Sequence, residues 1–212
     1  MLGSVFRLEG FSSRTDLGRT IDASDIVTTN NPGILRKMIA CYPGISDRAR
    51  VVPFGLRSLD VIVGLQQSES LEVTRRKLNI PSGKLVVACG YNAIPEQRHT
   101  MMIMALARLS APAKSRFLAL IPMTYPDNQA YREEVTKAVA ATNVDYLIQD
   151  KRMSIANVCR MRIVSDYVVS VQTTETLSAS IQSHRFAGSS MIVGKCLHPG
   201  VVERRDTPLR TG

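Results

Sequence analysis

The sequence contains few aromatic residues, few cysteines and no long apolar segment. None of its apolar runs approaches the roughly 18 residues that a transmembrane helix needs, so no membrane span is expected. Aromatic residues make up 5% of the 212 residues, and they do not alternate with basic residues as in single-strand nucleic-acid binders. The four cysteines have no paired spacing, which is typical of reduced thiols and not of a disulfide framework or a metal site. These features indicate a cytoplasmic protein.

Several catalytic motifs are also missing. The sequence has no Gly-x-Gly-x-x-Gly and no P-loop, which disfavours a dinucleotide oxidoreductase and a P-loop NTPase. It has no Gly-x-Ser-x-Gly elbow, which weighs against an α/β-hydrolase. It has no Asp-x-Asp and no cluster of His, Cys and carboxylate residues, so a metal-dependent mechanism has no evident ligands. Neither a metal nor another cofactor is expected.

The charge is strongly positive, with a net value of +9 and an isoelectric point near 9.7. Such a balance favours an anionic partner, which could be a nucleic acid, an anionic membrane surface or a phosphorylated substrate. The basic residues are scattered, however, and the densest group, Arg75–Lys77, is predicted to be a solvated helix face. No nucleic acid is therefore expected, and a nucleic-acid binder is kept as a third alternative.

Residues 1–78 predict one small β-α-β unit and one later helix, with irregular segments around them. Residues 1–20 are polar, lack periodicity and are predicted to be an irregular lead-in. One β-α-β unit follows, with strands at 24–29 and 50–55 and a helix that starts at Pro32. This unit is too small to be a domain by itself. Residues 57–68 are predicted to be a connection, and a basic amphipathic helix is predicted over 70–78.

From residue 85 the pattern becomes regular, because unbroken apolar runs alternate with helical segments. The five predicted strands are 85–89, 117–121, 144–148, 166–170 and 190–194. The four predicted helices are 96–109, 129–141, 154–163 and a segment after residue 176 whose apolar positions are Leu177, Ile181 and Phe186. Strands buried on both faces have such runs, so the sequence predicts an α/β fold with a doubly wound, Rossmann-like parallel sheet.

In such a sheet the ligand lies outside the carboxyl ends of the strands. Three polar loops open at that edge, at residues 90–99, 122–128 and 172–176. Glu175 could accept sugar hydroxyls there or could simply compensate the dipole of the next helix, which Thr174 or Thr176 could cap. His99 could donate to a phosphate or a hydroxyl, or could be a surface or capping residue.

Other polar and aromatic residues are expected to have structural roles. Lys84 could supply charge to a phosphate, but a solvated residue before a strand is the favoured interpretation. Tyr125 is expected to pack within its loop, and His184 is expected to be a surface or packing residue.

Three motifs are similar to those of a known family. They are Cys89–Ala93 followed by Gln97 and His99, then Ile121–Tyr125 followed by Tyr131–Val135, and then Thr174–Ser180 continuing to Gly188. In this order, and preceded by Val-Val-Pro-Phe-Gly55, they resemble the C-terminal half of a GT-B glycosyltransferase. The similarity is to bacterial surface-polysaccharide enzymes of the family 4 type and to the related fucosamine (Fuc4NAc) transferases.

The resemblance implies a nucleotide-sugar donor bound by residues 53–194, and a saccharide or lipid-linked acceptor in a second domain. Contact with a membrane surface would suit such an acceptor. Electrostatic support of the departing diphosphate would come from helix N–H groups and a cation, without a metal. The resemblance implies the following donor-binding residues: Gly90, Tyr91, Asn92, Arg98, His99, Thr174, Glu175, Ser178 and Ala179.

The sequence also departs from that family. Ser183 stands eight residues after Glu175, where members usually carry a second Glu that binds the ribose. Residues 1–52 match only the last part of an acceptor domain, and 195–212 are predicted to be an irregular tail, so a partial chain is expected and no catalytic base is identified. A non-catalytic nucleotide-binding or interaction module derived from the same fold is therefore the alternative.

Overall fold

The computed structural model describes residues 14–52, 55–172 and 178–194, with side chains described from residue 17 onward. The chain divides into two compact units, Met1–Phe54 and Gly55–Gly212, and each is described by itself. Within the described ranges, every helix is too short or too polar to cross a membrane.

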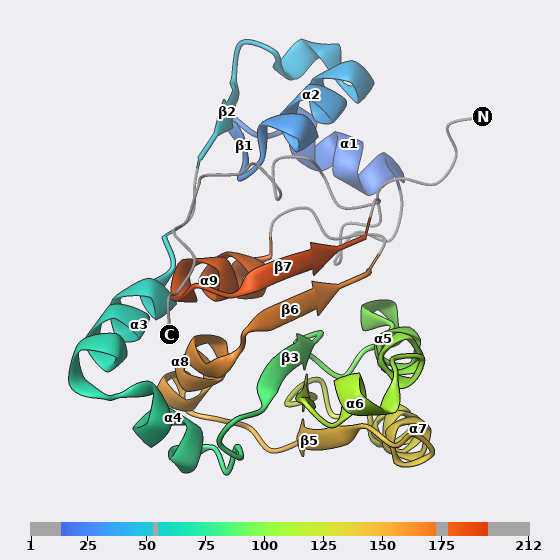
Figure 1. The fold of residues 1–212 in the computed structure, drawn as a ribbon. Helices are drawn as coiled ribbons and strands as arrows, with labels where there is room; N and C mark the ends of the chain where they lie inside the picture. The colour runs from blue at the N-terminus through green and yellow to red at the C-terminus, as the bar shows by residue number, and fades with distance from the viewer. Residues whose placement is uncertain (1–13, 53–54, 173–177, 195–212) are drawn as a thin grey trace. The chain divides into compact units, whose positions relative to one another are not determined.

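The first unit is a small β-α-β arrangement preceded by a helix (Figure 1). Its elements are α1 (Arg14–Asp22), β1 (Val27–Thr29), α2 (Pro32–Cys41), a 3₁₀ turn (Pro43–Ile45) and β2 (Ala49–Val51). The two strands pair in parallel, and Ile21, Val27, Ile45 and Ala49 form the core. The predicted β-α-β unit is confirmed, but the expectation of an irregular segment up to residue 20 is wrong, because α1 begins at Arg14.

The second unit contains a sheet of five parallel strands (Figure 1). The strands are β3 (Leu85–Cys89), β4 (Phe117–Pro122), β5 (Asp145–Gln149), β6 (Tyr167–Ser170) and β7 (Ser190–Val193). Their order is β5-β4-β3-β6-β7. The chain moves outward from β3 through β4 to β5, then crosses to the other side of β3 for β6 and β7. The predicted doubly wound parallel sheet is confirmed. The direction in which successive strands are added to the sheet reverses between β3 and β6.

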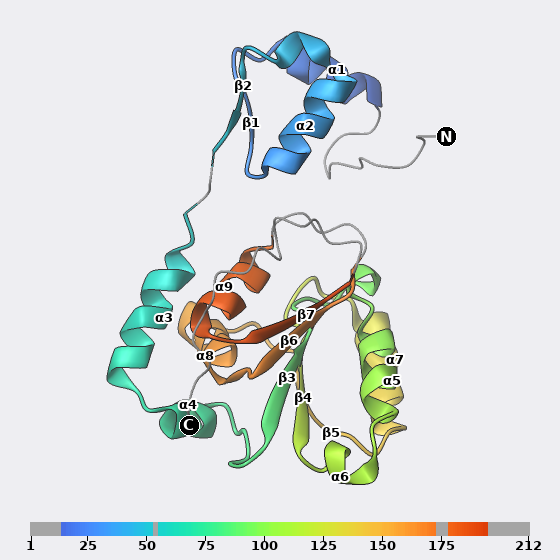
Figure 2. The ribbon, with the colours of Figure 1, turned by 45° about the horizontal axis from the view of Figure 1, so that its top comes forward.

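Helices cover both faces of this sheet (Figure 2). One face carries α5 (His99–Ala107) and α7 (Gln129–Ala140), which pack against each other; the short α6 (Ala111–Lys114) follows α5. The other face carries α3 (Arg57–Ser68), α4 (Leu71–Lys77), α8 (Ile155–Val164) and α9 (Ala179–Ala187). The central strands alternate between two apolar layers. Val87 and Ile121 pack toward α5 and α7, whereas Val86 and Leu120 belong to the opposite layer, with residues of α8 and with two residues that follow α4.

Two predictions about the helices are wrong. Residues 57–68 form α3 and not a connection, because Val61, Ile62 and Leu65 recur at helical spacing and pack against α8. The helix predicted from residue 96 begins at His99, since Pro95–Gln97 forms a separate 3₁₀ turn.

Arg75 is buried, which corrects the expectation that Arg75–Lys77 is only a solvated face. Its guanidinium donates to the carbonyl of Lys84 at 2.8 Å and pairs with Asp166 at 3.3 Å. The carboxylate of Asp166 also accepts the backbone N–H of Val86 at 2.8 Å. These contacts attach α4 to the residues that precede β3 and β6, and Asp166 in turn binds β3.

A network of charged side chains joins α4 to α8. Arg160 donates to both carboxylate oxygens of Glu69, at 2.6 and 3.0 Å, and Lys77 donates to the same carboxylate at 2.7 Å. Hydrogen bonds from Arg160 and then from Lys77 lower the pKa of Glu69 from 4.5 to about 2. The carboxylate is therefore ionised over the whole pH range in which most proteins are folded, and it holds both cations in place.

We expect Glu69→Gln to lower the urea midpoint of unfolding at pH 7. Because the folded-state pKa is below the unfolded one, the ionised carboxylate stabilises the fold above pH 4.5, and this contribution is lost as the pH falls toward 2. The difference in urea midpoint between wild type and variant should therefore shrink as the pH falls from 4.5 toward 2. Glu72→Gln, in the exposed first turn of α4, is the control and should show no comparable pH dependence. A difference that stays constant with pH would contradict this assignment.

Candidate functional site

The loops after β3 and β6 meet where the strand order reverses. In open α/β sheets this point lies at the carboxyl ends of the strands and is the usual place for a ligand. The two loops are joined at their start, since the N–H of Gly90 donates to the carbonyl of Val169 at 3.3 Å. The loop after β4 is joined as well, because the N–H of Ala93 donates to the carbonyl of Tyr125 at 2.6 Å.

Gly90 is the residue on which the loop after β3 turns. Its φ is +68°, a conformation that favours glycine. A Cβ at this position would lie 2.6 Å from Nε2 of His99 and 3.0 Å from Oε1 of Gln97. Both of those side chains are buried, so they have little room to move away. The imidazole therefore occupies the space that any other residue at position 90 would need.

A ring of hydrogen bonds connects the loops after β3 and β6. Gln97 donates from Nε2 to Oε1 of Gln172 at 2.7 Å, and its Oε1 accepts the backbone N–H of Tyr91 at 3.2 Å. Gln172 then donates from Nε2 to the hydroxyl of Tyr91 at 3.2 Å. Each amide both donates and accepts, which fixes its orientation. The ring sets the position of the Gly90 loop relative to the end of β6.

His99 is fully buried at the first turn of α5. The hydroxyl of Tyr131 lies 3.1 Å from Nδ1 of His99 and 3.3 Å from its backbone nitrogen. The backbone N–H donates to this hydroxyl, and the hydroxyl shares a second hydrogen bond with Nδ1 whose direction depends on the imidazole tautomer. Burial lowers the pKa of His99 to about 4, so the ring is neutral near pH 7. His99 is therefore a neutral hydrogen-bonding group that supplies no positive charge.

Three buried polar atoms of the described residues have no hydrogen-bond partner. They are Oδ1 of Asn92, Nε2 of His99 and Oγ of Ser170. Asn92 and His99 belong to the segment after β3, and Ser170 is the last residue of β6. Buried polar atoms are nearly always paired, so three of them at the same edge of the sheet mark a place where a polar ligand can bind.

The helix after β6 starts at the same edge. Ser178 caps α9, since its hydroxyl accepts the N–H of Ile181 at 3.4 Å, and this corrects the expected cap at Thr174 or Thr176. Ser178 is buried and Ala179 is exposed. Thr174, Glu175 and the apolar position Leu177 lie outside the described residues.

Ser183 is not available to a ligand. It is fully buried, its hydroxyl lies 2.9 Å from that of Ser58 on α3, and it donates to the carbonyl of Ala179 at 2.7 Å. His184 is buried beside it, which agrees with a packing role. Phe186, expected to be an apolar core position, is 48% exposed.

The other candidates are either exposed or lie at the opposite edge of the sheet. Arg98 is exposed at the start of α5 and has a φ of +56°, an uncommon conformation for a residue with a side chain. Tyr125, expected to pack within its loop, is 58% exposed. Lys84 lies at the opposite, amino edge of the sheet.

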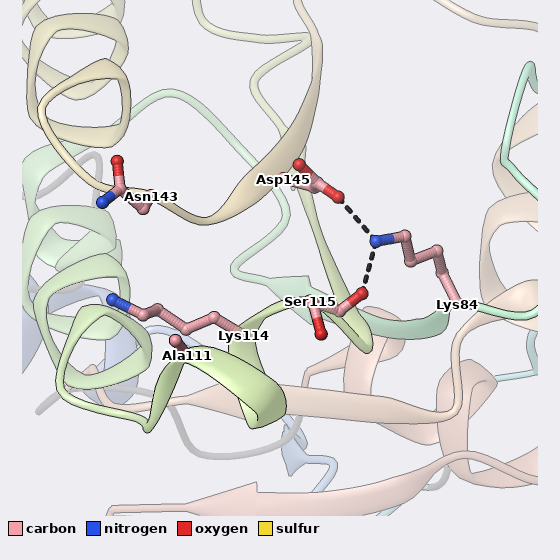
Figure 3. A pocket seen from close by; sticks show the side chains of 6 residues that line it. All are labelled: Lys84, Ala111, Lys114, Ser115, Asn143 and Asp145. Carbon is pink, nitrogen blue, oxygen red and sulfur yellow. Dashed lines mark hydrogen bonds and ion pairs between the residues drawn. The ribbon is translucent and has the colours of Figure 1, made fainter.

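Lys84 pairs with Asp145 at 2.7 Å and donates to the carbonyl of Ser115 (Figure 3). These contacts line a cavity of about 230 Å³ that also includes Lys114 and Asn143. Lys84 therefore holds the amino ends of β3 and β5 together at the edge opposite the candidate site, and it is an ion-paired residue where a solvated one was expected.

The structure thus brings Gly90, Tyr91, Asn92 and His99 together and places the start of α9 at the same edge. Sequence reasoning missed the roles of Gln97, Gln172 and Ser170. The signals available were the place of Ser170 and Gln172 at the end of a predicted strand, and the place of Gln97 in the motif after Cys89–Ala93. No group of three or more His, Cys, Asp or Glu residues that could hold a metal occurs in the part of the chain that the structure describes.

No protein-family model and no curated protein matches the sequence. Solved structures do match. A glycosyltransferase from Rickettsia africae has 14% identity and a TM-score of 0.70, over 92% of this chain and 52% of that one. An α,α-trehalose-phosphate synthase (UDP-forming) from Burkholderia xenovorans has 11% identity and a TM-score of 0.67, over 91% and 50%.

WaaG, a glycosyltransferase involved in lipopolysaccharide biosynthesis, has 15% identity and a TM-score of 0.63, over 80% of this chain and 44% of its own. The chain thus spans about half the length of the structures that it matches. At these identities the likeness shows the fold, which is that of GT-B glycosyltransferase domains.

We expect Gly90→Ala to destabilise the protein more than Gly83→Ala does. Both positions have positive φ, at +68° and +75°, and a side chain in that region costs about 1–2 kcal/mol. A Cβ at position 83 would meet nothing within 4 Å, whereas a Cβ at position 90 would meet His99. The clash should add roughly 1–3 kcal/mol in chemical denaturation.

The double variant Gly90→Ala/His99→Ala separates the clash from the backbone strain. Removing the imidazole should cancel most of the extra cost of alanine at position 90, so the two substitutions should be strongly non-additive. Strictly additive free energies of unfolding would show that the imidazole is not what excludes a side chain there.

Proposed function

We propose that this chain is the donor-binding half of a glycosyltransferase and binds a nucleotide-sugar at the edge between β3 and β6. The observation that carries the proposal is the set of unpartnered buried polar atoms on Asn92, His99 and Ser170 at the point where the strand order reverses. The likeness of the fold to glycosyltransferases supports it. Residues 53–194 would form the donor domain, and 1–52 would belong to the acceptor domain.

Each part of the donor has a group that suits its chemistry. The backbone at Gly90 and Tyr91 would lie against the donor, because position 90 carries no side chain. Arg98 and the N–H groups at Ser178 and Ala179 would stabilise the departing diphosphate without requiring a metal. Asn92 and the neutral His99 would hydrogen-bond to uncharged groups, and Thr174 and Glu175 would contact the sugar.

The acceptor would be a saccharide or a lipid-linked saccharide of polysaccharide or glycolipid synthesis. The name of WaaG, which links one similar structure to lipopolysaccharide biosynthesis, supports that class. A cytoplasmic location, at or near a membrane surface, belongs to the same proposal. The acceptor and the catalytic base would be held by parts of the enzyme outside residues 53–194.

A non-catalytic nucleotide-binding module is the second candidate. It is favoured by Ser183, which stands in place of the second Glu of the family and is buried against Ser58. A hydroxyl in this position cannot bind a ribose. Binding of a sugar nucleotide without transfer or hydrolysis, measured on the chain together with an acceptor domain, would identify this candidate.

Thermal unfolding in the presence of UDP-, GDP- and TDP-sugars tests the proposal. We expect one of these nucleotide classes to raise the Tm by roughly 5–10 °C at about one hundred times its Kd. Glu175→Ala should weaken binding of the sugar nucleotide more than binding of the nucleoside diphosphate, because the carboxylate is assigned to the sugar. Glu72→Ala, on the exposed surface of α4, is the matched control. The proposal fails if no sugar nucleotide raises the Tm, or if Glu175→Ala behaves as wild type.

A further inference from the structure

Helix α5 exposes an apolar face that its own fold does not cover. Met102 and Ile103 are buried toward the sheet and α7, whereas Met101 and Met104 are each 55% exposed and Leu109, just after the helix, is 37% exposed. Met101, Met104 and Leu109 define the α5 face. Most surface helices are polar on the side away from the core. A helix that is apolar on both sides therefore indicates that its exposed side contacts an apolar partner outside this fold.

The charged residues next to α5 in the sequence are all basic. Between Glu96 and Asp127 the sequence contains no acidic residue, while it contains Arg98, Arg108, Lys114 and Arg116. Arg98 precedes the helix, and the other three follow it. The neighbouring α7 contributes one acidic contact, since Glu134 accepts a hydrogen bond from Thr100 at 3.4 Å. That contact lies near the start of α5, so the end that carries Arg108 is the basic end.

We propose that the α5 face rests on an anionic lipid bilayer, with its methionine and leucine side chains among the upper acyl chains and Arg108 at the level of the headgroups. Charge complementarity favours this occupant, because the exposed Arg108 and Arg116 follow the apolar stripe and no acidic residue lies between them. Methionine side chains are unbranched and flexible, and they adapt to a fluid surface. Figure 2 shows α5 on the flank of the sheet opposite α3, α8 and α9, so this contact leaves the candidate donor edge free.

Vesicle flotation tests the proposal on the full chain. We expect the protein to float with vesicles of phosphatidylcholine and phosphatidylglycerol, and not with phosphatidylcholine alone. Met101→Ser/Met104→Ser should reduce the partition coefficient at least about tenfold, since two apolar side chains are lost from the contact with the acyl chains. Arg108→Gln should reduce it about fivefold, and high salt should weaken binding of the wild type.

The control is Ile155→Ser/Ile192→Ser, which removes two side chains of similar exposure, 46% and 52%, from α8 and β7. This variant should float as wild type does. Equal flotation of the methionine variant and the control would overturn the proposal, and so would flotation that does not depend on anionic lipid. Self-association that the methionine variant abolishes, with no binding to vesicles, would also overturn it, because the face would then contact a second copy. All variants alter exposed residues, so an unchanged Tm verifies folding.

Discussion

The contact between Gly90 and His99 is the constraint on which the candidate site depends. The imidazole occupies the volume beside position 90, so the turn after β3 requires glycine for space as well as for its positive φ. The hydroxyl of Tyr131, on α7, holds the same imidazole through Nδ1. The backbone of this loop is thus fixed by a buried side chain and carries no side chain of its own at position 90. A ligand can approach such a backbone more closely than one that carries side chains.

The ring of Gln97, Gln172 and Tyr91 extends this constraint from one strand to the next. In a parallel sheet, the loops after neighbouring strands lie close together but have no backbone ladder to align them. Buried amides supply that alignment, because each of them is satisfied on both its donor and acceptor sides. The atoms left unpaired, on Asn92, His99 and Ser170, lie at the same edge of the sheet. The same edge thus combines loops held rigidly by hydrogen bonds with buried polar atoms that have no partner.

Periodicity predicted the sheet well, because unbroken apolar runs such as Leu85–Cys89 are typical of strands buried on both faces. It failed for α3, whose polar residues mask a narrow apolar stripe around Ile62. At the site, the loop of Gly90 and His99 was predictable from its place after a strand. The burial and neutrality of His99 were not, because they depend on Tyr131, which is 32 residues distant along the chain. Ser183 shows the same limit, since Ser58 covers it from α3.

The neutrality of the buried groups restricts how a donor could lie under the proposed function. A phosphate is charged, and placing it beside neutral Asn92, His99 and Ser170 away from water would cost more than their hydrogen bonds return. Sugar or ribose hydroxyls both donate and accept without charge, and they match these three atoms. The diphosphate would then lie nearer the exposed Arg98 and the start of α9, where a cation and backbone N–H groups can balance it in contact with solvent. Burial, more than residue type, therefore decides which end of such a ligand each group could hold.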